Sequence, residues 1–269
     1  MITLGALWRK LFADPWRAID EEAARERAEL AATGAIDRRP LWVLIVVALV
    51  MVFQEYWGDR NAFDRLFPTL ADRPRWGTLY EFSWWSGAKL VGYLIVPAVI
   101  VNRVGIRLSD CGLSFAGLRK HAWIYLSLFG AIAPVIFLAS RTEAFQATYP
   151  FYKLAARSWT DLLAWEAMYA STFFALEFFF RGFMLFLLRR AFGANAIFVM
   201  IVPYCMIHFH KPVPEVVGAI FAGIILGTLA LRTRSIWCGV LIHISVAWSM
   251  DLLALWHTTG FPGDGRFIG

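Results

Sequence analysis

A glutamate and an arginine lie four residues apart inside a strongly apolar stretch of the chain. This stretch runs from Phe173 to Arg190 and contains Glu177 and Arg181. A carboxylate near the centre of a bilayer costs about 2.5–3.5 kcal/mol on insertion scales, so it needs a partner or a function. Residues at i and i+4 are neighbours on a helix, and a carboxylate that precedes its cation is the better order. The pair is therefore either a buried ion pair that fixes helix packing or a reactive carboxylate that its arginine holds in place.

Several ionisable residues fall within apolar runs: Lys89, Glu166, Glu177, Arg181, His208, His243 and Asp251. Glu166 precedes Glu177 by about three helical turns, so both point the same way, and we expect Glu166 at the rim of a cavity. A lone histidine in a helix usually packs against its neighbours. Two histidines and a glutamate on three separate spans are harder to explain by packing, because each of them is costly and needs a polar companion.

The types of these three residues suit the hydrolysis of a peptide bond. Glu177 could act as a general base that activates a water molecule, while His208 and His243 stabilise the oxyanion. The same three residues could instead ligate zinc and leave a fourth position open. The spacing does not separate these two chemistries, because the ligands come from different helices and no His-Glu-x-x-His motif is present.

Long apolar runs must position these residues. The chain has 269 residues, is 59% hydrophobic and has a mean hydropathy of +0.57. Its apolar runs are continuous rather than alternating, which predicts an all-α fold, a multi-pass transmembrane helical bundle of seven or eight spans. The predicted spans cover residues 41–57, 82–101, 122–139, 160–190, 195–208, 216–231 and 235–256. The fourth is long for a bilayer, and the count rises to eight if it breaks near Gly182.

The first 40 residues differ from the rest. Residues 1–40 combine aromatic residues such as Trp8 and Trp16 with many charges, which predicts a cytoplasmic, interfacial amphipathic segment. Residues 41–269 form the predicted membrane-embedded domain. The distribution of arginine and lysine favours an N-terminus in the cytoplasm. The net charge of +6 suits contact with anionic membrane lipids, and we do not expect nucleic acid as a partner. The three cysteines are expected to be small apolar fillers.

Three segments together resemble a known family. They are the stretch from Glu177 through Arg181 to Phe183, the stretch from Tyr204 to His208, and the run from Phe221 to His243. Their order resembles the CPBP intramembrane endopeptidases, also called Abi, which include the CAAX prenyl-protein proteases and bacteriocin-processing proteins. The similarity covers about residues 100–256.

The resemblance implies an intramembrane endopeptidase that cleaves a membrane-associated peptide or protein. Four residues are then expected to be catalytic: Glu177, Arg181, His208 and His243. Three others are expected to line the site: Tyr204, Glu166 and Phe180. The resemblance implies metal-independent chemistry more than zinc, so no cofactor is expected. It also implies a location in a bacterial inner membrane.

Two positions depart from the family pattern. The family's first motif is Glu-Glu-x-x-x-Arg, and its first glutamate position is Leu176 here. The family's last motif is His-x-x-x-Asn or Asp, and its final position is Ala247. Either Glu177 takes the base role in a variant site, or the protein is a non-catalytic membrane scaffold that binds a peptide. A proton-coupled transporter is a third hypothesis, but it predicts two symmetric halves, and no such repeat is visible. The sequence does not indicate an oligomeric state.

Overall fold

The computed structural model describes residues 3–115, 118–209, 211 and 213–265. The regular structure of these residues is helical, and Leu113 and Ser235 form an isolated bridge. The all-α class is therefore confirmed. The helices are α1 (Leu4–Trp8), η1 (Arg9–Ala13), α2 (Asp14–Ala32), α3 (Arg39–Tyr56), α4 (Arg60–Leu66), α5 (Pro68–Ala71), α6 (Gly77–Lys89), η2 (Leu90–Ile95), α7 (Val96–Arg103), η3 (Leu108–Cys111), α8 (Leu118–Ala139), α9 (Glu143–Thr148), η4 (Ala155–Arg157), α10 (Trp159–Glu177), η5 (Phe178–Leu185), α11 (Phe186–Phe192), η6 (Gly193–Asn195), α12 (Ala196–Met206), α13 (Val213–Thr233) and α14 (Trp237–His257).

Within the described residues, six helical stretches are long and apolar enough to cross a membrane. They are Arg39–Tyr56, Gly77–Arg103, Leu118–Ala139, Trp159–Met206, Val213–Thr233 and Trp237–His257. Large apolar side chains remain exposed on them, for example Trp123 and Leu126 of α8. Such side chains suit contact with lipid, because lipid does not reward their burial. The chain is thus an integral membrane protein, while the count of seven or eight spans stays a prediction.

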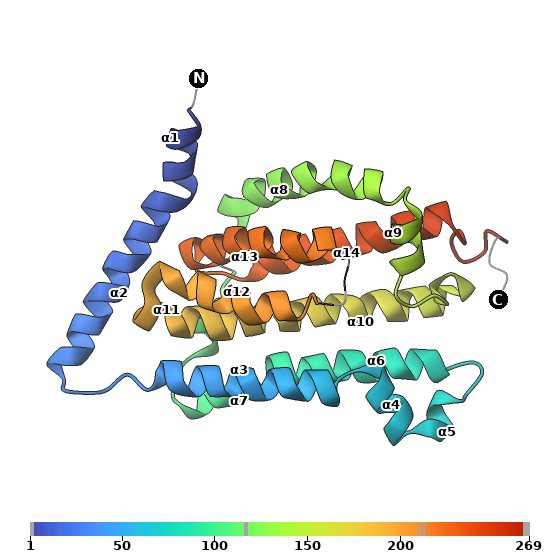
Figure 1. Cartoon of the computed structure of the whole chain (residues 1–269), viewed down its shortest axis with the longest axis horizontal. Helices are drawn as coiled ribbons and strands as arrows, with labels where there is room; N and C mark the ends of the chain where they lie inside the picture. The colour runs from blue at the N-terminus through green and yellow to red at the C-terminus, as the bar shows by residue number, and fades with distance from the viewer. Residues whose placement is uncertain (1–2, 116–117, 210, 212, 266–269) are drawn as a thin grey trace. The chain divides into compact units, whose positions relative to one another are not determined.

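The stretch Trp159–Met206 has 48 residues, or about 72 Å at 1.5 Å per residue, which exceeds the ~30 Å hydrocarbon core. It does not break at Gly182, because α10 continues through the π-helix η5 into α11. It reverses at η6, where Gly193 has a φ of +58°. A Cβ at Gly193 would lie 2.1 Å from Oδ1 of Asp20, so this turn requires glycine. Helix α12 then returns beside η5 (Figure 1).

The chain divides into two compact units. The first contains Met1–Val52, Ile95–Leu118 and Glu177–Gly239, and the second contains Phe53–Leu94, Arg119–Leu176 and Val240–Gly269. Residues 1–40 fall in the first unit, and their separation from residues 41–269 stays a prediction. The N-terminal helices follow one another without an interruption from Leu4 to Ala32.

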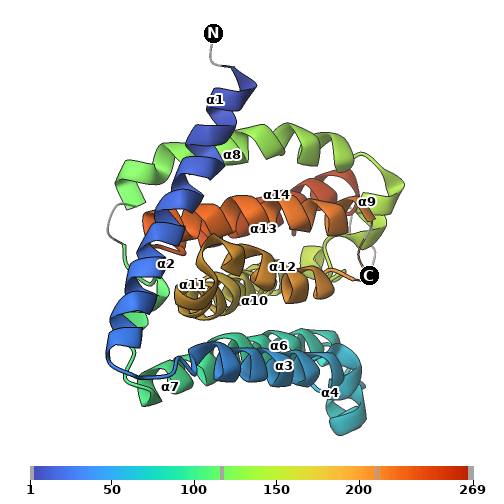
Figure 2. The same cartoon turned by 60° about the vertical axis from the view of Figure 1, so that its left-hand side comes forward.

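In the first unit, α2 packs against α11 and η6. Both views show α2 beside α11 (Figures 1 and 2). The Trp16 indole donates a hydrogen bond of 2.9 Å to the Thr228 hydroxyl, and Asp20 accepts one of 2.8 Å from the Ala194 amide. Helix α12 packs against α13 at two glycines. A Cβ at Gly223 would lie 2.8 Å from Ile201, and one at Gly227 would lie 3.3 Å from Ile197. The Gly-x-x-x-Gly spacing therefore serves close packing within the bundle.

The core of the second unit is aromatic. Trp165 stacks on Tyr169 with ring centroids 4.8 Å apart, and Phe82 meets Trp165 edge-on at 4.8 Å. Ala247 and Leu255 of α14 complete this cluster. Aromatic pairs of this geometry contribute about 0.5–1.5 kcal/mol each beyond the area they bury.

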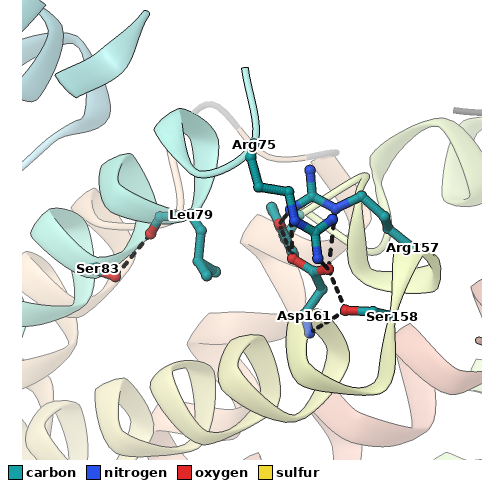
Figure 3. A network of polar contacts seen from close by, with 7 residues as sticks. Arg75, Leu79, Ser83, Arg157, Ser158 and Asp161 are labelled. Carbon is teal, nitrogen blue, oxygen red and sulfur yellow. Dashed lines mark hydrogen bonds and ion pairs between the residues drawn. The ribbon is translucent and has the colours of Figure 1, made fainter. Parts of the chain in front are cut away.

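A buried carboxylate fixes the start of α10 in the second unit. Asp161 accepts hydrogen bonds from Arg157 at 2.6 Å, Ser158 at 2.5 Å and Tyr152 at 2.7 Å. Arg75 approaches the same carboxylate at 3.5 Å, so two arginines converge on it (Figure 3). The hydrogen bond to Asp161 raises the pKa of Arg157, although burial opposes this change. The Ser158 hydroxyl also accepts the Asp161 amide at 3.1 Å and so caps the helix.

Candidate active site

The predicted pair forms in the first unit. Nη1 of Arg181 lies 3.0 Å from Oε1 of Glu177, and both side chains are fully buried. Glu177 ends α10, and the π-helix η5 begins at the next residue and contains Arg181. π-Helical turns occur often at functional sites, because the wider turn changes the direction in which side chains point. The sequence had predicted the contact from the spacing alone.

The Glu177 carboxylate also lies against the first turn of α14. A Cβ at Gly239 would be 2.2 Å from Oε2 of Glu177, so only glycine leaves room for the carboxylate. The first turn of a helix carries free N–H groups and the positive end of the helix dipole, which favour a negative charge. The carboxylate is thus held between an arginine of its own helix and the start of another helix. No role was predicted for Gly239 from the sequence. The only indication of a close contact there was a glycine in the first turn of a helix.

The guanidinium of Arg181 stacks on a tyrosine. Its Cζ lies 4.1 Å from the ring centroid of Tyr204, which is 1% exposed. Phe180 meets the same tyrosine ring edge-on at 5.3 Å and is fully buried. A desolvated cation–π contact of this kind contributes about 2 kcal/mol. Tyr204 and Phe180 therefore hold the arginine in place, while their role in lining a cavity stays a prediction.

His208 lies beside Tyr204 but outside the helix. The sequence placed it at the end of the span 195–208, whereas α12 ends at Met206 and His208 belongs to the following turn. Its Nδ1 is 2.8 Å from the Tyr204 carbonyl, and its ring meets the Tyr204 ring edge-on at 4.8 Å. A carbonyl only accepts, so Nδ1 carries the hydrogen, and in the neutral ring Nε2 is the nitrogen that can take up a proton.

These contacts join Glu177, Arg181, Tyr204 and His208 into one continuous set within the first unit. The set combines a carboxylate that can accept a proton, an arginine that orients it and an imidazole with a defined tautomer. Such groups can carry out general acid–base chemistry at a carbonyl.

Two predicted site residues belong to the second unit. His243 stacks on Phe173, with ring centroids 5.5 Å apart and an interplanar angle of 4°. Glu166 is 8% exposed, and its backbone carbonyl accepts the Trp248 indole at 3.3 Å. Neither carboxylate oxygen of Glu166 has a hydrogen-bond partner among the described residues. The assignment of both residues to the site stays a prediction.

The alanine at position 247, where the family pattern has Asn or Asp, lies in apolar surroundings. Ala247 is 4% exposed and lies in the aromatic cluster of the second unit, with Phe82 and Trp165. An asparagine at this position would need hydrogen-bond partners that these apolar groups do not provide. The other departure, Leu176, is half-buried at the end of α10.

The side chains that the structure describes include potential metal ligands and thiols, and the expectation that no cofactor is needed stays a prediction. Among these residues, no group of three or more His, Cys, Asp or Glu side chains converges to hold a metal ion. Cys111 and Cys238 are buried and free of disulfides, as expected of apolar fillers. Burial raises the pKa of the Cys111 thiol to about 12, so this thiol is not a nucleophile at neutral pH.

Cavities of about 780 Å³ and about 550 Å³ lie near helix α2 in the first unit. Both are lined by charged and apolar residues, and neither is lined by Glu177, Arg181 or His208. The carboxylate site and these cavities are therefore separate features of the unit.

Comparison with known protein families gives a match to part of the chain. Residues 153–249 match the protein-family model described as type II CAAX prenyl endopeptidase Rce1-like. The matched segment contains Glu177, Arg181, Tyr204, His208 and His243 and is shorter than the similarity predicted over residues 100–256. No curated protein matches the chain, and no solved structure matches it. Over residues 153–249 the chain is similar to the Rce1-like CAAX prenyl endopeptidases, which confirms the family resemblance of its motifs.

Proposed function

We propose that this protein is an intramembrane endopeptidase that hydrolyses a peptide bond in a membrane-associated substrate. The set that runs from buried Glu177, Arg181 and Tyr204 to half-buried His208 is the observation that carries the proposal. It lies within the segment that matches a family of CAAX-type proteases. A lipidated tail, a leader peptide or a C-terminal sorting segment would be a suitable substrate. We further propose a bacterial inner membrane, with the N-terminus in the cytoplasm.

In this mechanism Glu177 takes a proton from a water molecule as the water oxygen attacks the scissile carbonyl carbon. The new carbon–oxygen bond moves the carbonyl π electrons onto oxygen and gives a tetrahedral oxyanion. His208, protonated at Nε2, and His243 donate N–H hydrogen bonds to this oxyanion. Collapse of the intermediate breaks the carbon–nitrogen bond, and the proton on Glu177 passes to the leaving amine. Arg181 acts as a positioning residue, because its ion pair fixes the carboxylate.

His243 is proposed as the second histidine. It follows Gly239 by four residues on α14, which is one helical turn, so the two residues share a helix face. Gly239 is the residue against which Glu177 rests. Helical spacing therefore supports the assignment of His243, which also keeps the motif order of the family.

The test is a cleavage assay with the purified full chain in proteoliposomes. The substrates are a pool of lipidated tails, including farnesylated CAAX peptides, together with leader peptides and C-terminal sorting segments, and the products are read by mass spectrometry. General-base catalysis contributes typically 10²–10⁴-fold, so Glu177→Gln should lower the cleavage rate by about that factor. Asp251→Asn is the matched control, because it also removes a buried carboxylate from a span but lies outside the proposed machinery. Equal rates for wild type and Glu177→Gln would remove Glu177 from the mechanism.

A non-catalytic, peptide-binding role is the second candidate, and the apolar surroundings of Ala247 favour it. If the wild-type chain cleaves no member of the pool, the double variant Leu176→Glu, Ala247→Asn restores the family's polar residues. Cleavage gained by this variant would support the non-catalytic role of the wild type. Cleavage by the wild type itself would exclude that role. Chelation in the same assay tests the zinc alternative, which predicts loss of activity.

A further inference from the structure

The larger cavity of the first unit lies where membrane-spanning helices end. Helix α3 begins at Arg39, α13 ends at Thr233, and the last turn of α11 contains Arg189 and Arg190. All four residues line the cavity of about 780 Å³. The ends of spanning helices lie at the level of the lipid headgroups, because the apolar part of each helix is matched to the hydrocarbon core. The cavity therefore faces the interfacial region of the membrane.

Arginine side chains outnumber carboxylates on the cavity wall. The arginines are Arg39, Arg189, Arg190 and Arg234, and the carboxylates are Glu26, Glu29 and Asp110. Ion pairs hold three of these arginines: Arg189 with Glu26 at 2.5 Å, Arg190 with Asp37 at 2.7 Å, and Arg234 with Glu22. Asp110 is paired with Arg107 at 3.5 Å.

Arg39 differs from the other three arginines. Its side chain forms no ion pair with any residue that the structure describes, although it is only half-exposed. The backbone N–H of Arg39 donates a hydrogen bond of 3.1 Å to the Asp37 carboxylate. The same carboxylate forms its ion pair with Arg190. Asp37 and Glu26 lie near enough to act on the charge of Arg39, but each forms its ion pair with another arginine. A guanidinium that lines a cavity without an ion pair presents donors to an anion, and its planar fork suits phosphate oxygens.

The rest of the wall is apolar. Leu30, Ile106, Phe186 and Leu187 line the cavity beside the charged residues. The volume falls within the range of about 300–1,000 Å³ that is common for small-molecule sites. Cations next to apolar groups at the membrane interface match an amphiphile with a phosphate headgroup better than they match free phosphate.

We infer that this cavity binds the phosphodiester headgroup of an anionic phospholipid, and that Arg39 is the main arginine that contacts the headgroup. The glycerol and the first acyl carbons contact the apolar wall. Basic pockets between spanning helices are known to take such headgroups. The site is separate from Glu177 and does not depend on the proposed proteolytic activity.

The experiment measures lipid dissociation constants by native mass spectrometry of the full chain in a neutral detergent. Phosphatidylglycerol is the anionic probe, phosphatidylcholine the zwitterionic probe and inorganic phosphate the soluble one. One arginine near a membrane surface contributes about 1 kcal/mol toward anionic lipid, so Arg39→Gln should weaken phosphatidylglycerol binding about fivefold. Arg39→Lys should retain most of the affinity, because the charge remains. Arg38→Gln is the matched control, since Arg38 is exposed and does not line the cavity.

Weaker binding in Arg39→Gln alone, with phosphatidylcholine bound more weakly than phosphatidylglycerol, would support the inference. An equal loss in Arg38→Gln and Arg39→Gln would overturn it, because the effect would then reflect net charge. Displacement of the lipid by inorganic phosphate at millimolar concentration would also overturn it and would indicate a site for free phosphate. Equal affinity for both lipids would also overturn it, because the cavity would then not distinguish an anionic headgroup from a zwitterionic one.

Discussion

Each unit of the molecule contains a buried carboxylate paired with an arginine four residues away on the chain, and the two pairs are built differently. In the second unit Asp161 accepts bonds from Arg157, Ser158 and Tyr152 at the start of a helix. In the first unit Glu177 pairs with Arg181 in the middle of a span and lies against Gly239. The Asp161 arrangement surrounds its carboxylate with side-chain donors, as a structural site does. The Glu177 arrangement places its carboxylate between Arg181 and the first turn of α14.

This difference predicts that the two arginines contribute unequally to stability. Removal of one partner from a buried pair costs about 3–5 kcal/mol, because an uncompensated charge remains. Arg181→Gln should therefore lower the free energy of unfolding by about that amount. Arg157→Gln should lower it by about 1 kcal/mol, because Ser158, Tyr152 and Arg75 still surround Asp161. Unfolding in a titration with denaturing detergent measures both values, and equal losses would contradict the comparison.

Gly239 allows a more local test of the Glu177 arrangement. A Cβ at Gly239 would meet Oε2 of Glu177 at 2.2 Å, so Gly239→Ala must displace the carboxylate. A misplacement of about 1 Å can cost 10²-fold in rate, and we expect a loss of about that size in the cleavage assay. Gly218→Ala on α13 is the control, since a Cβ there meets nothing within 4 Å. The comparison fails if both variants keep the wild-type rate.

Glu22 of α2 forms ion pairs with Arg189 and Arg234 that are more exposed than the two buried pairs, and we expect them to contribute less to stability. Burial would raise the pKa of Glu22, but hydrogen bonding to Arg234 and the charges of Arg189 and Arg234 lower it below its ordinary value of 4.5. A depressed folded-state pKa gives stability that is present above pH 4.5 and is lost as the pH falls toward the folded-state pKa. Glu22 is about a third exposed, so the effect is a few tenths of a kcal/mol.

Limited proteolysis between pH 5 and pH 3 should therefore show faster cleavage in α2 on acidification. The variant Glu22→Gln should lose part of this pH dependence, because its amide does not titrate. Identical pH profiles for wild type and variant would show that Glu22 does not hold α2 in place.

Much of the fold could be predicted from hydropathy, because each spanning helix is a continuous apolar run. The seven predicted runs all coincide with helices, from α3 to α14. The turns that connect these helices could not be predicted in the same way. The reversal at η6 depends on the close approach of Asp20 to Gly193, two residues far apart in the sequence. Local propensity does not encode such a contact.

The candidate site was predictable only where its contacts are local. The i,i+4 spacing predicted the pair of Glu177 and Arg181, and it is present. The contact of Glu177 with Gly239 joins distant segments, so no local pattern indicated it. The cluster around Asp161 was missed, although Ser158 three residues before Asp161 is a capping pattern that could have revealed it.

The central claim is that Glu177 activates a water molecule, and oxygen-18 labelling tests it most directly. In the proteoliposome assay with labelled water, the wild-type chain should place one solvent oxygen in the new carboxyl terminus of each product. The Glu177→Gln variant should form almost no labelled product, while Asp251→Asn should form it at the wild-type rate. Labelled product from Glu177→Gln at an unchanged rate would contradict the account.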